Sequence, residues 1–136
     1  MNLNKITIVV PCYNEGNYID KLTDKLLLQC DTLKLDYEII FVEDGSTDNT
    51  FDEIAKKINK NNKIKAVKLS RNYGSHIAIS AGIENSNETD LIIVCPLDDI
   101  EIGNLFSNLV DKYKEGFEIV WTVRKRRNKN LFLKIM

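Results

Sequence analysis

The sequence predicts an α/β fold, a Rossmann-like three-layer α/β/α sandwich in which a mostly parallel sheet lies between helices. Short apolar runs rich in β-branched residues alternate with segments whose apolar residues recur at helical spacing. The connections are short, which favours strand–helix–strand units with parallel strands. No internal repeat or low-complexity linker interrupts the 136 residues, so a single domain is expected.

The strands are predicted from the apolar runs, which are Lys5–Val10, Tyr37–Val42, Ile64–Leu69, Leu91–Cys95 and Phe117–Val123. The helices are predicted from apolar stripes, which span Ile19–Leu33, Phe51–Ile58, Ser75–Glu84 and Leu105–Tyr113. Ser75 is expected to cap the third helix and Asp48 the second, since both residue types favour that position. Trp121 in the fifth strand is expected in the core, and the single histidine, His76, in solvent.

Composition narrows the function classes. The net charge is −1, so no overall attraction to nucleic acid is expected. Residues Met1 to Lys5 lead straight into a strand, and no apolar run approaches the ~20 residues that span a bilayer, so neither a signal peptide nor a spanning helix is expected. Three cysteines without a CxxC spacing indicate buried thiols in a reducing compartment rather than a disulfide framework or a zinc site.

Polar and charged residues gather where the predicted strands end. The segments concerned are Pro11–Gly16, Glu43–Ser46, Ser70–Ser75, Pro96–Asp99 and Arg124–Arg127. In a parallel sheet these ends meet at one edge, which is where ligands bind in open α/β sheets. Carboxylates and guanidinium groups together suit a ligand with a metal-bound diphosphate and many hydroxyls. Turn formation alone accounts for Asp48, but it does not require arginine, tyrosine and repeated carboxylates.

A diphosphate at this edge is expected on a metal ion rather than on a glycine-rich loop. The first loop is not a G-x-G-x-x-G turn, and no G-x-x-x-x-G-K-[ST] loop occurs. Asp98 and Asp99 supply oxygen ligands of the kind that Mg²⁺ or Mn²⁺ prefers. The alternative is that they cap the helix beginning near Leu105, although they lie several residues too early for that.

Three ordered motifs resemble those of the family 2 glycosyltransferases. They are Ile8-Val9-Val10-Pro11-Cys12-Tyr13-Asn14-Glu15, Tyr37–Asp48 with its Glu43-Asp44-Gly45-Ser46 turn, and Leu69-Ser70-Arg71-Asn72-Tyr73-Gly74. The branch that the sequence resembles is the polyprenyl-phosphate sugar transferases, such as dolichol-phosphate mannose synthase and the undecaprenyl-phosphate glycosyltransferases. The resemblance covers nearly the whole chain. It implies a GT-A fold and inversion at the anomeric carbon of the sugar.

The resemblance also implies roles for single residues. Pro11, Tyr13 and Glu15 match first-loop residues that hold the base and ribose. Asp44 matches the strand-two carboxylate that contacts the base.

The third loop and the basic segment carry further matches. Arg71, Asn72 and Gly74 match a third-loop motif that lines the donor site. Arg124 and Arg127 match basic positions near the diphosphate or the acceptor phosphate.

The metal motif departs from the family pattern. Asp98 matches the second aspartate of the family's Asp-x-Asp motif, but Pro96 stands in place of the first. Asp98 is therefore the expected metal ligand, with phosphate oxygens and water completing the shell, and with help from Asp99 or Glu101. This departure leaves a variant donor or a loss of transfer activity open.

The expected reaction is a single displacement at the donor sugar. Arg124 or Arg127 and the metal would neutralise the leaving nucleoside diphosphate. A polyprenyl phosphate acceptor is already anionic, whereas a saccharide hydroxyl needs a base, for which Glu101 is the candidate. Members of the branch run beyond residue 136, so residues 1–136 are expected to be the nucleotide-sugar-binding part of a longer protein working at the inner, cytoplasmic face of a membrane.

The basic run Arg124–Lys129 fits a membrane surface as well as a solvated tail, and it lacks the interleaved aromatics typical of nucleic-acid binding. Two other functions stay open, a non-catalytic nucleotide-sugar-binding module and a nucleotidyltransferase. The sequence does not decide the sugar or the base of the donor. The oligomeric state also stays open, with a homo-oligomer as one option.

Overall fold

The computed structural model describes residues 2–96, 103–123 and 132–135. Its elements, in chain order, are β1 (Lys5–Cys12), α1 (Gly16–Leu33), β2 (Asp36–Glu43), α2 (Thr50–Lys60), β3 (Ile64–Lys68), α3 (Ser75–Glu84), β4 (Leu91–Val94), α4 (Leu105–Lys114), β5 (Val120–Val123) and β6 (Phe132–Ile135). The predicted alternation of strands and helices is therefore confirmed as far as α4.

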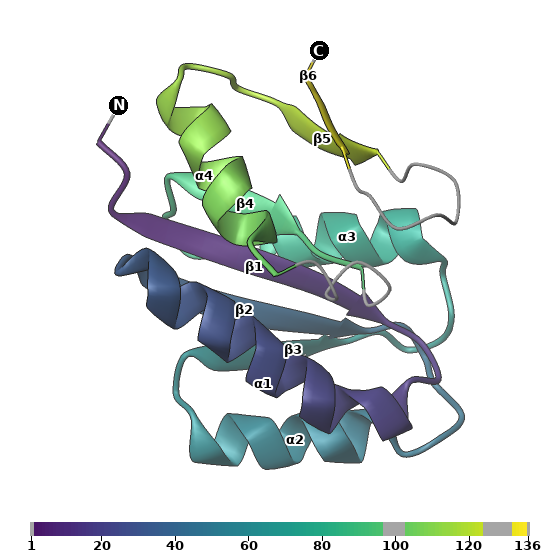
Figure 1. Ribbon diagram of the computed structural model, residues 1–136. Helices are drawn as coiled ribbons and strands as arrows, with labels where there is room; N and C mark the ends of the chain where they lie inside the picture. Colours follow the sequence, from purple (N-terminus) through teal and green to yellow (C-terminus); the bar gives the residue numbers. More distant parts are fainter. Residues whose placement is uncertain (1, 97–102, 124–131, 136) are drawn as a thin grey trace.

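The main sheet has four parallel strands in the order β3-β2-β1-β4, shown in Figure 1. The chain moves from β1 to β2 to β3 in one direction and then crosses back to place β4 on the far side of β1. Because such crossovers are right-handed, this reversal moves α3 to the face of the sheet opposite α1 and α2. The reversal point lies between β1 and β4, which is where ligands bind in sheets of this kind.

Both faces of the sheet are buried, as the continuous apolar runs of β1 and β2 require. Alternate residues of β1, such as Ile6 and Ile8, pack with α1, α2 and α4 in the larger of two core clusters. Val9 and Ile40 point the other way and pack against Ala78 of α3. The three-layer sandwich is therefore confirmed.

The tight packing of α3 depends on Gly82. A Cβ atom at this position would lie 2.4 Å from Cγ1 of Val9 and 2.9 Å from Cγ2 of Val42. The glycine therefore lets the helix backbone approach the strands more closely than any larger residue would.

The prediction for the fifth strand is wrong in two respects. β5 begins at Val120 rather than Phe117, and it pairs with β6 in a separate antiparallel sheet instead of joining the parallel one. Trp121, expected in the core, is 58% exposed. The alternation of apolar residues identified the strand, but it could not identify the partner, because β6 lies beyond a predominantly basic segment.

β4 pairs only with β1 among the described residues, so its other side is open. An apolar cavity of about 520 Å³ lies along that side. Its walls come from β4, β5, α3 and α4, with Ile79 of α3 and Leu109 of α4 on opposite helical layers. The sheet and the β5–β6 hairpin are thus separated by a gap lined with apolar side chains.

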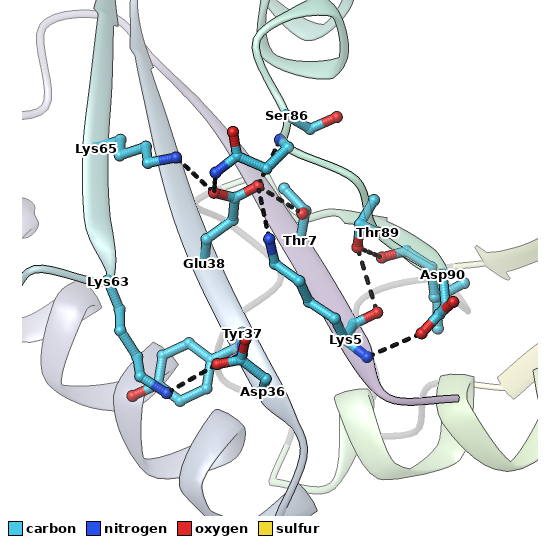
Figure 2. A network of polar contacts seen from close by, with 12 residues as sticks. Lys5, Thr7, Asp36, Tyr37, Glu38, Lys63, Lys65, Ser86, Thr89 and Asp90 are labelled. Atoms are coloured by element: carbon cyan, nitrogen blue, oxygen red, sulfur yellow. Dashed lines mark hydrogen bonds and ion pairs between the residues drawn. The ribbon is translucent and has the colours of Figure 1, made fainter. Parts of the chain in front are cut away.

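A buried carboxylate joins the strands at the opposite, amino-terminal edge (Figure 2). Glu38 of β2 is 4% exposed. It accepts hydrogen bonds from Thr7 Oγ1 at 3.0 Å and Lys65 Nζ at 2.8 Å. The backbone N–H and the side-chain amide of Asn87 also donate to it, at 2.8 and 2.9 Å. Burial opposes ionisation of Glu38, but these hydrogen bonds outweigh it and lower its pKa.

The cysteines are buried free thiols, as predicted. Burial raises the pKa of Cys30 to about 12, with a smaller contribution from the charge of Asp31. Burial also raises the pKa of Cys12, and the charges of Glu15 and Glu43 add to the effect. Neither thiol is therefore a ready nucleophile at neutral pH.

Candidate functional site

The loops after β1, β2 and β3 meet at the carboxyl edge of the sheet, as the strand order requires. Hydrogen bonds join the loop after β2 to the segment after β1 and to the loop after β3. We call the residues between the strands and the next helices the first loop (13–15), the second loop (44–49) and the third loop (69–74).

The first and second loops are joined by reciprocal hydrogen bonds. Asn14 donates its backbone N–H to Ser46 Oγ at 2.9 Å, and its side-chain oxygen accepts the backbone N–H of Thr47 at 2.8 Å. Asn14 has φ of 51°, a left-handed conformation that asparagine tolerates better than most residues. The sequence motifs alone do not single out Asn14 as a site residue. The residue type is the signal that could have done so, because asparagine tolerates a left-handed backbone conformation.

Asp48 holds the start of α1 as well as the start of α2. One carboxylate oxygen accepts the backbone N–H of Gly16 at 3.1 Å. The other accepts the backbone N–H of Thr50 at 2.9 Å and also the Thr50 hydroxyl. The hydroxyl bond is the largest cause of the lowered pKa of Asp48. The predicted N-cap of α2 is wrong by one residue, since Asn49 occupies that position, although Asp48 still accepts a backbone N–H at the start of the helix.

Asp44 joins the second loop to the third. Its two carboxylate oxygens accept the backbone N–H groups of Tyr73 at 2.7 Å and Gly74 at 3.0 Å. The residue is 4% exposed. Neighbouring Glu43 is also buried and accepts the backbone N–H of Ser46. These carboxylates thus shape the second and third loops.

The third loop presents an exposed cation on an aromatic ring. The Arg71 guanidinium lies 4.1 Å from the centroid of Tyr73, whose hydroxyl lies 3.1 Å from Ser70 Oγ. The hydrogen bond with Ser70, followed by the charge of Arg71, lowers the pKa of Tyr73. Gly74 begins the approach to α3 with φ of 94° and is the N-cap residue, so the prediction of Ser75 at the N-cap is wrong by one residue.

The remaining predicted residues are placed as follows. Pro11 is half-buried in β1, and Tyr13 is 43% exposed in the first loop. Glu15 is half-buried, and its backbone N–H donates to Thr50 Oγ1 at 2.9 Å. Asn72 is exposed, and His76 is in solvent as expected. These residues all lie at the carboxyl edge.

Five predicted residues lie outside the described part of the chain and remain predictions, namely Asp98, Asp99, Glu101, Arg124 and Arg127. The described residues contain no group of three or more potential ligands placed to hold a metal ion. Asp44 and Asp48 already accept backbone N–H groups, so a metal at this edge would depend on the segment around Asp98. The N-cap of α4 is Asn104, which removes capping of that helix as the explanation of Asp98 and Asp99.

The motifs at this edge correspond to a known family. Residues 7–135 match the family model described as Glycosyl transferase family 2. The chain belongs to this family. The first, second and third loops all lie inside the matched range, so the resemblance read from their motifs is confirmed.

The curated relatives of this chain include undecaprenyl-phosphate sugar transferases. The chain is 38% identical over 130 residues to an uncharacterized glycosyltransferase of Synechocystis, with 96% of this chain and 41% of the relative aligned. It is 35% identical over 133 residues to the undecaprenyl-phosphate 4-deoxy-4-formamido-L-arabinose transferase of Proteus mirabilis, with 97% and 40% aligned. The chain thus spans about two fifths of the length of these relatives.

Solved structures confirm the GT-A fold of the chain. The mannosyltransferase PcManGT of Pyrobaculum calidifontis, in complex with GDP-Man and Mn²⁺, superposes with a TM-score of 0.76 at 18% identity, covering 94% of this chain and 38% of that one. Staphylococcus aureus TarS 1–349 in complex with UDP-GlcNAc superposes with a TM-score of 0.68 at 21% identity, covering 93% of this chain and 36% of that one.

None of the helices in the described ranges combines the length and apolar character needed to cross a bilayer.

Proposed function

We propose that residues 1–136 form the nucleotide-sugar-binding part of an inverting glycosyltransferase that moves a sugar from a nucleoside-diphosphate sugar to a polyprenyl phosphate. The observation that carries the proposal is the meeting of the first three motif loops at the carboxyl edge of the sheet, beside the reversal point between β1 and β4. Family membership supports the transfer chemistry.

The donor and acceptor classes follow from the relatives. Undecaprenyl-phosphate transferases aligned over nearly the whole chain support a polyprenyl phosphate acceptor, and hence work at the inner face of a membrane. The neighbours solved with GDP-Man or UDP-GlcNAc support a nucleoside-diphosphate sugar donor. The basic run 124–129 would meet anionic headgroups or the acceptor phosphate.

Within this proposal, Tyr13 and Glu15 lie beside the nucleoside, and Arg71 faces the diphosphate. Asp98 would hold Mg²⁺ or Mn²⁺ with the donor phosphates, and the ion would supply positive charge for the leaving group. Arg124 and Arg127 would add to that charge.

The acceptor would attack from the face of the sugar opposite the leaving group, which inverts the anomeric centre. A phosphate acceptor needs no base, because it is already anionic. Glu101 would serve as base only for a hydroxyl acceptor.

Asp98→Asn should abolish the metal-dependent part of nucleotide binding. A thermal-shift series with UDP and GDP, each with and without Mn²⁺, measures it. Ligand at about 100 times its Kd stabilises the native state by about 2.7 kcal/mol, which is a readily measured rise in Tm. We expect wild type to show a Mn²⁺-dependent rise with one nucleotide and Asp98→Asn to show none.

Asp52→Asn is the matched control, because Asp52 is an exposed carboxylate on α2 and is not among the predicted metal ligands. It should keep the full Mn²⁺-dependent rise. Undiminished Mn²⁺-dependent binding by Asp98→Asn would remove Asp98 from the site. Binding without transfer or donor hydrolysis in the longest natural form of the protein would favour the non-catalytic module.

A further inference from the structure

Side chains of the segment after β2 hold the backbone of the first loop and of the start of α1. Three successive backbone N–H groups donate to three side-chain oxygens. The pairs, with the donor first, are Asn14 with Ser46 Oγ at 2.9 Å, Glu15 with Thr50 Oγ1 at 2.9 Å and Gly16 with Asp48 Oδ2 at 3.1 Å. The Ser-x-Asp-x-Thr spacing of the second motif therefore supplies the acceptors for the backbone that follows β1.

Asn14 closes this arrangement from the side of the first loop. Its side-chain oxygen accepts the backbone N–H of Thr47 at 2.8 Å and the Thr47 hydroxyl at 3.2 Å. With its own N–H bound to Ser46, Asn14 is tied to the second loop by both its backbone and its side chain. Its φ of 51° adds a second requirement, because few residue types combine a short side-chain acceptor with tolerance of a left-handed backbone.

Tyr13 is the side chain that this arrangement presents. Its ring is 43% exposed, so its position depends on the backbone more than on packing. Cys12, on one side, accepts the backbone N–H of Asp44 at its carbonyl at 2.9 Å, and Asn14, on the other side, donates to Ser46. Tyr13 thus lies between two residues that are both hydrogen-bonded to the second loop. Because tyrosine has only two side-chain torsions, a fixed backbone leaves the ring few other positions.

We propose that Asn14 is a positioning residue, which locks the first loop onto the second and thereby holds the Tyr13 ring in place for the nucleoside of the donor. The contact between Tyr13 and a nucleoside rests on the proposed function, whereas the locking of the loop does not. Asn14 then acts on donor affinity through Tyr13. The acceptor oxygen of Asn14 and its tolerance of positive φ can be separated by substitution.

The first test uses amide hydrogen exchange, followed by NMR, in the protein without added nucleotide. Asn14→Gly removes the acceptor oxygen and keeps a residue that readily adopts positive φ. We expect the Thr47 amide to exchange about 2- to 10-fold faster, as for the loss of a hydrogen bond between neutral groups. Asn14→Asp keeps both an acceptor oxygen and tolerance of this φ, so the Thr47 amide should stay protected. Unchanged exchange in Asn14→Gly, or equal losses of protection in both variants, would overturn the proposal.

Asn61→Gly is the matched control for Asn14→Gly. The side-chain oxygen of Asn61 also accepts a backbone N–H, that of Lys63 at 2.9 Å, but it does so between α2 and β3, at the amino-terminal edge of the sheet. Exchange should therefore rise at Lys63 and stay unchanged at Thr47. Faster exchange at Thr47 in this variant would show that the loop responds to any loosening of the fold, which contradicts a specific lock by Asn14.

The second test is a double-mutant cycle on the binding of UDP and GDP with Mn²⁺, measured by calorimetry. Tyr13→Ala should weaken binding of the preferred nucleotide about 10-fold or more, as for the loss of a base–aromatic contact. Asn14→Gly should weaken it too, and the double variant should be no weaker than Tyr13→Ala, because Asn14 acts through Tyr13. Additive losses would show that Asn14 acts on the nucleotide by another route and would overturn the proposal.

Stability separates positioning from a general structural effect. Asn14→Gly and Asn61→Gly each remove one acceptor of a backbone N–H, so urea denaturation should give similar losses of stability for both. Only Asn14→Gly should weaken nucleotide binding. Equal changes in affinity for the two variants would mean that binding follows stability, and this result would contradict the positioning role.

Two outcomes keep the proposals apart. If wild type binds no nucleoside diphosphate, the proposed function and the donor role of Tyr13 fail together, while the exchange data still decide whether Asn14 locks the loop. If Asn14→Gly does not fold, Ser46→Ala replaces it, because it removes the acceptor of the Asn14 N–H and leaves every residue of the first loop unchanged. It should speed exchange at the Asn14 amide and show the same lack of additivity with Tyr13→Ala, and their absence would count equally against the proposal.

Discussion

Replacing Phe106 with alanine should lower the free energy of unfolding by about 3–5 kcal/mol, as is usual for truncation of a buried aromatic side chain. Phe106 is fully buried in the larger core cluster, where α4 packs against α1 and the sheet. Urea denaturation followed by circular dichroism measures the change. The expected loss is a large part of the stability of a domain of this size.

The same substitution should loosen the start of α4, because it removes the buried ring that packs this end of the helix into the core, although the backbone N–H of position 106 remains. The backbone N–H of Phe106 donates to the side-chain oxygen of Gln29 on α1 at 3.2 Å, which satisfies one of the unpaired amides at the helix start. Since α4 follows the segment that contains Asp98, a loosened start should also weaken Mn²⁺-dependent nucleotide binding.

Phe51→Ala is the control for Phe106→Ala. Phe51 is only half-buried on α2 and lies under the Lys68 ammonium. Its truncation should cost clearly less stability and leave Mn²⁺-dependent binding unchanged. A loss below about 1 kcal/mol for Phe106→Ala would mean that the core relaxes around the cavity far more than related cores do.

Glu38→Gln should destabilise the fold by about 2–3 kcal/mol at pH 7, because it leaves buried donors without a charged acceptor. The carboxylate is 5% exposed and takes hydrogen bonds from β1, β3 and the turn before β4. Glutamine keeps the size of the side chain but turns one acceptor into a donor that faces the Asn87 amide or the Lys65 ammonium. Urea midpoints of wild type and variant give the difference.

The pH dependence of this difference tests its origin. The pKa of Glu38 in the folded state is below its ordinary value of 4.5. A carboxyl of lowered pKa contributes stability above its unfolded pKa, and the contribution is lost as the pH falls through the folded pKa. The gap between wild type and Glu38→Gln should therefore be full at pH 7, begin to shrink as the pH falls below about 4.5 and be lost once the pH has fallen through the folded-state pKa.

Asp36→Asn is the matched carboxylate control. Asp36 lies on β2, as Glu38 does, and pairs with Lys63 at 3.2 Å, but the two side chains are 64% and 41% exposed. The hydrogen bond from Lys63 lowers its pKa as well, yet solvent screens the pair, so little change in stability is expected. Equal effects of the two substitutions, or a gap for Glu38→Gln that does not depend on pH, would contradict the role assigned to burial.

The sequence predicted those parts of the fold that local periodicity determines. Helical spacing located α1, and β-branched runs located β1 and β2, because both faces of these strands are buried. The sequence analysis misplaced β5 and Trp121, because strand pairing depends on residues that lie far apart in the chain. The pairing of Val120 with Ile135 leaves no trace in the run around Trp121.

The candidate site was predictable to a similar degree. The motifs located the loops correctly, since strand ends of a parallel sheet must share an edge. They did not reveal how Asp44 is used, because a carboxylate that binds a ligand and one that holds a backbone look alike in sequence. The hydrogen bonds to Tyr73 and Gly74 could be found only from the fold.

Among the described residues, the side of β4 that faces away from β1 has no strand partner, which makes this sheet a template for further pairing. Leu91–Val94 contains no lysine or proline, the residues that commonly protect an exposed edge from other chains. Ile79 of α3 and Leu109 of α4 line the gap beside it, so an added strand would have apolar neighbours on both of its faces. Unless another strand occupies that place, concentrated solutions of residues 1–136 should be prone to edge-to-edge aggregation.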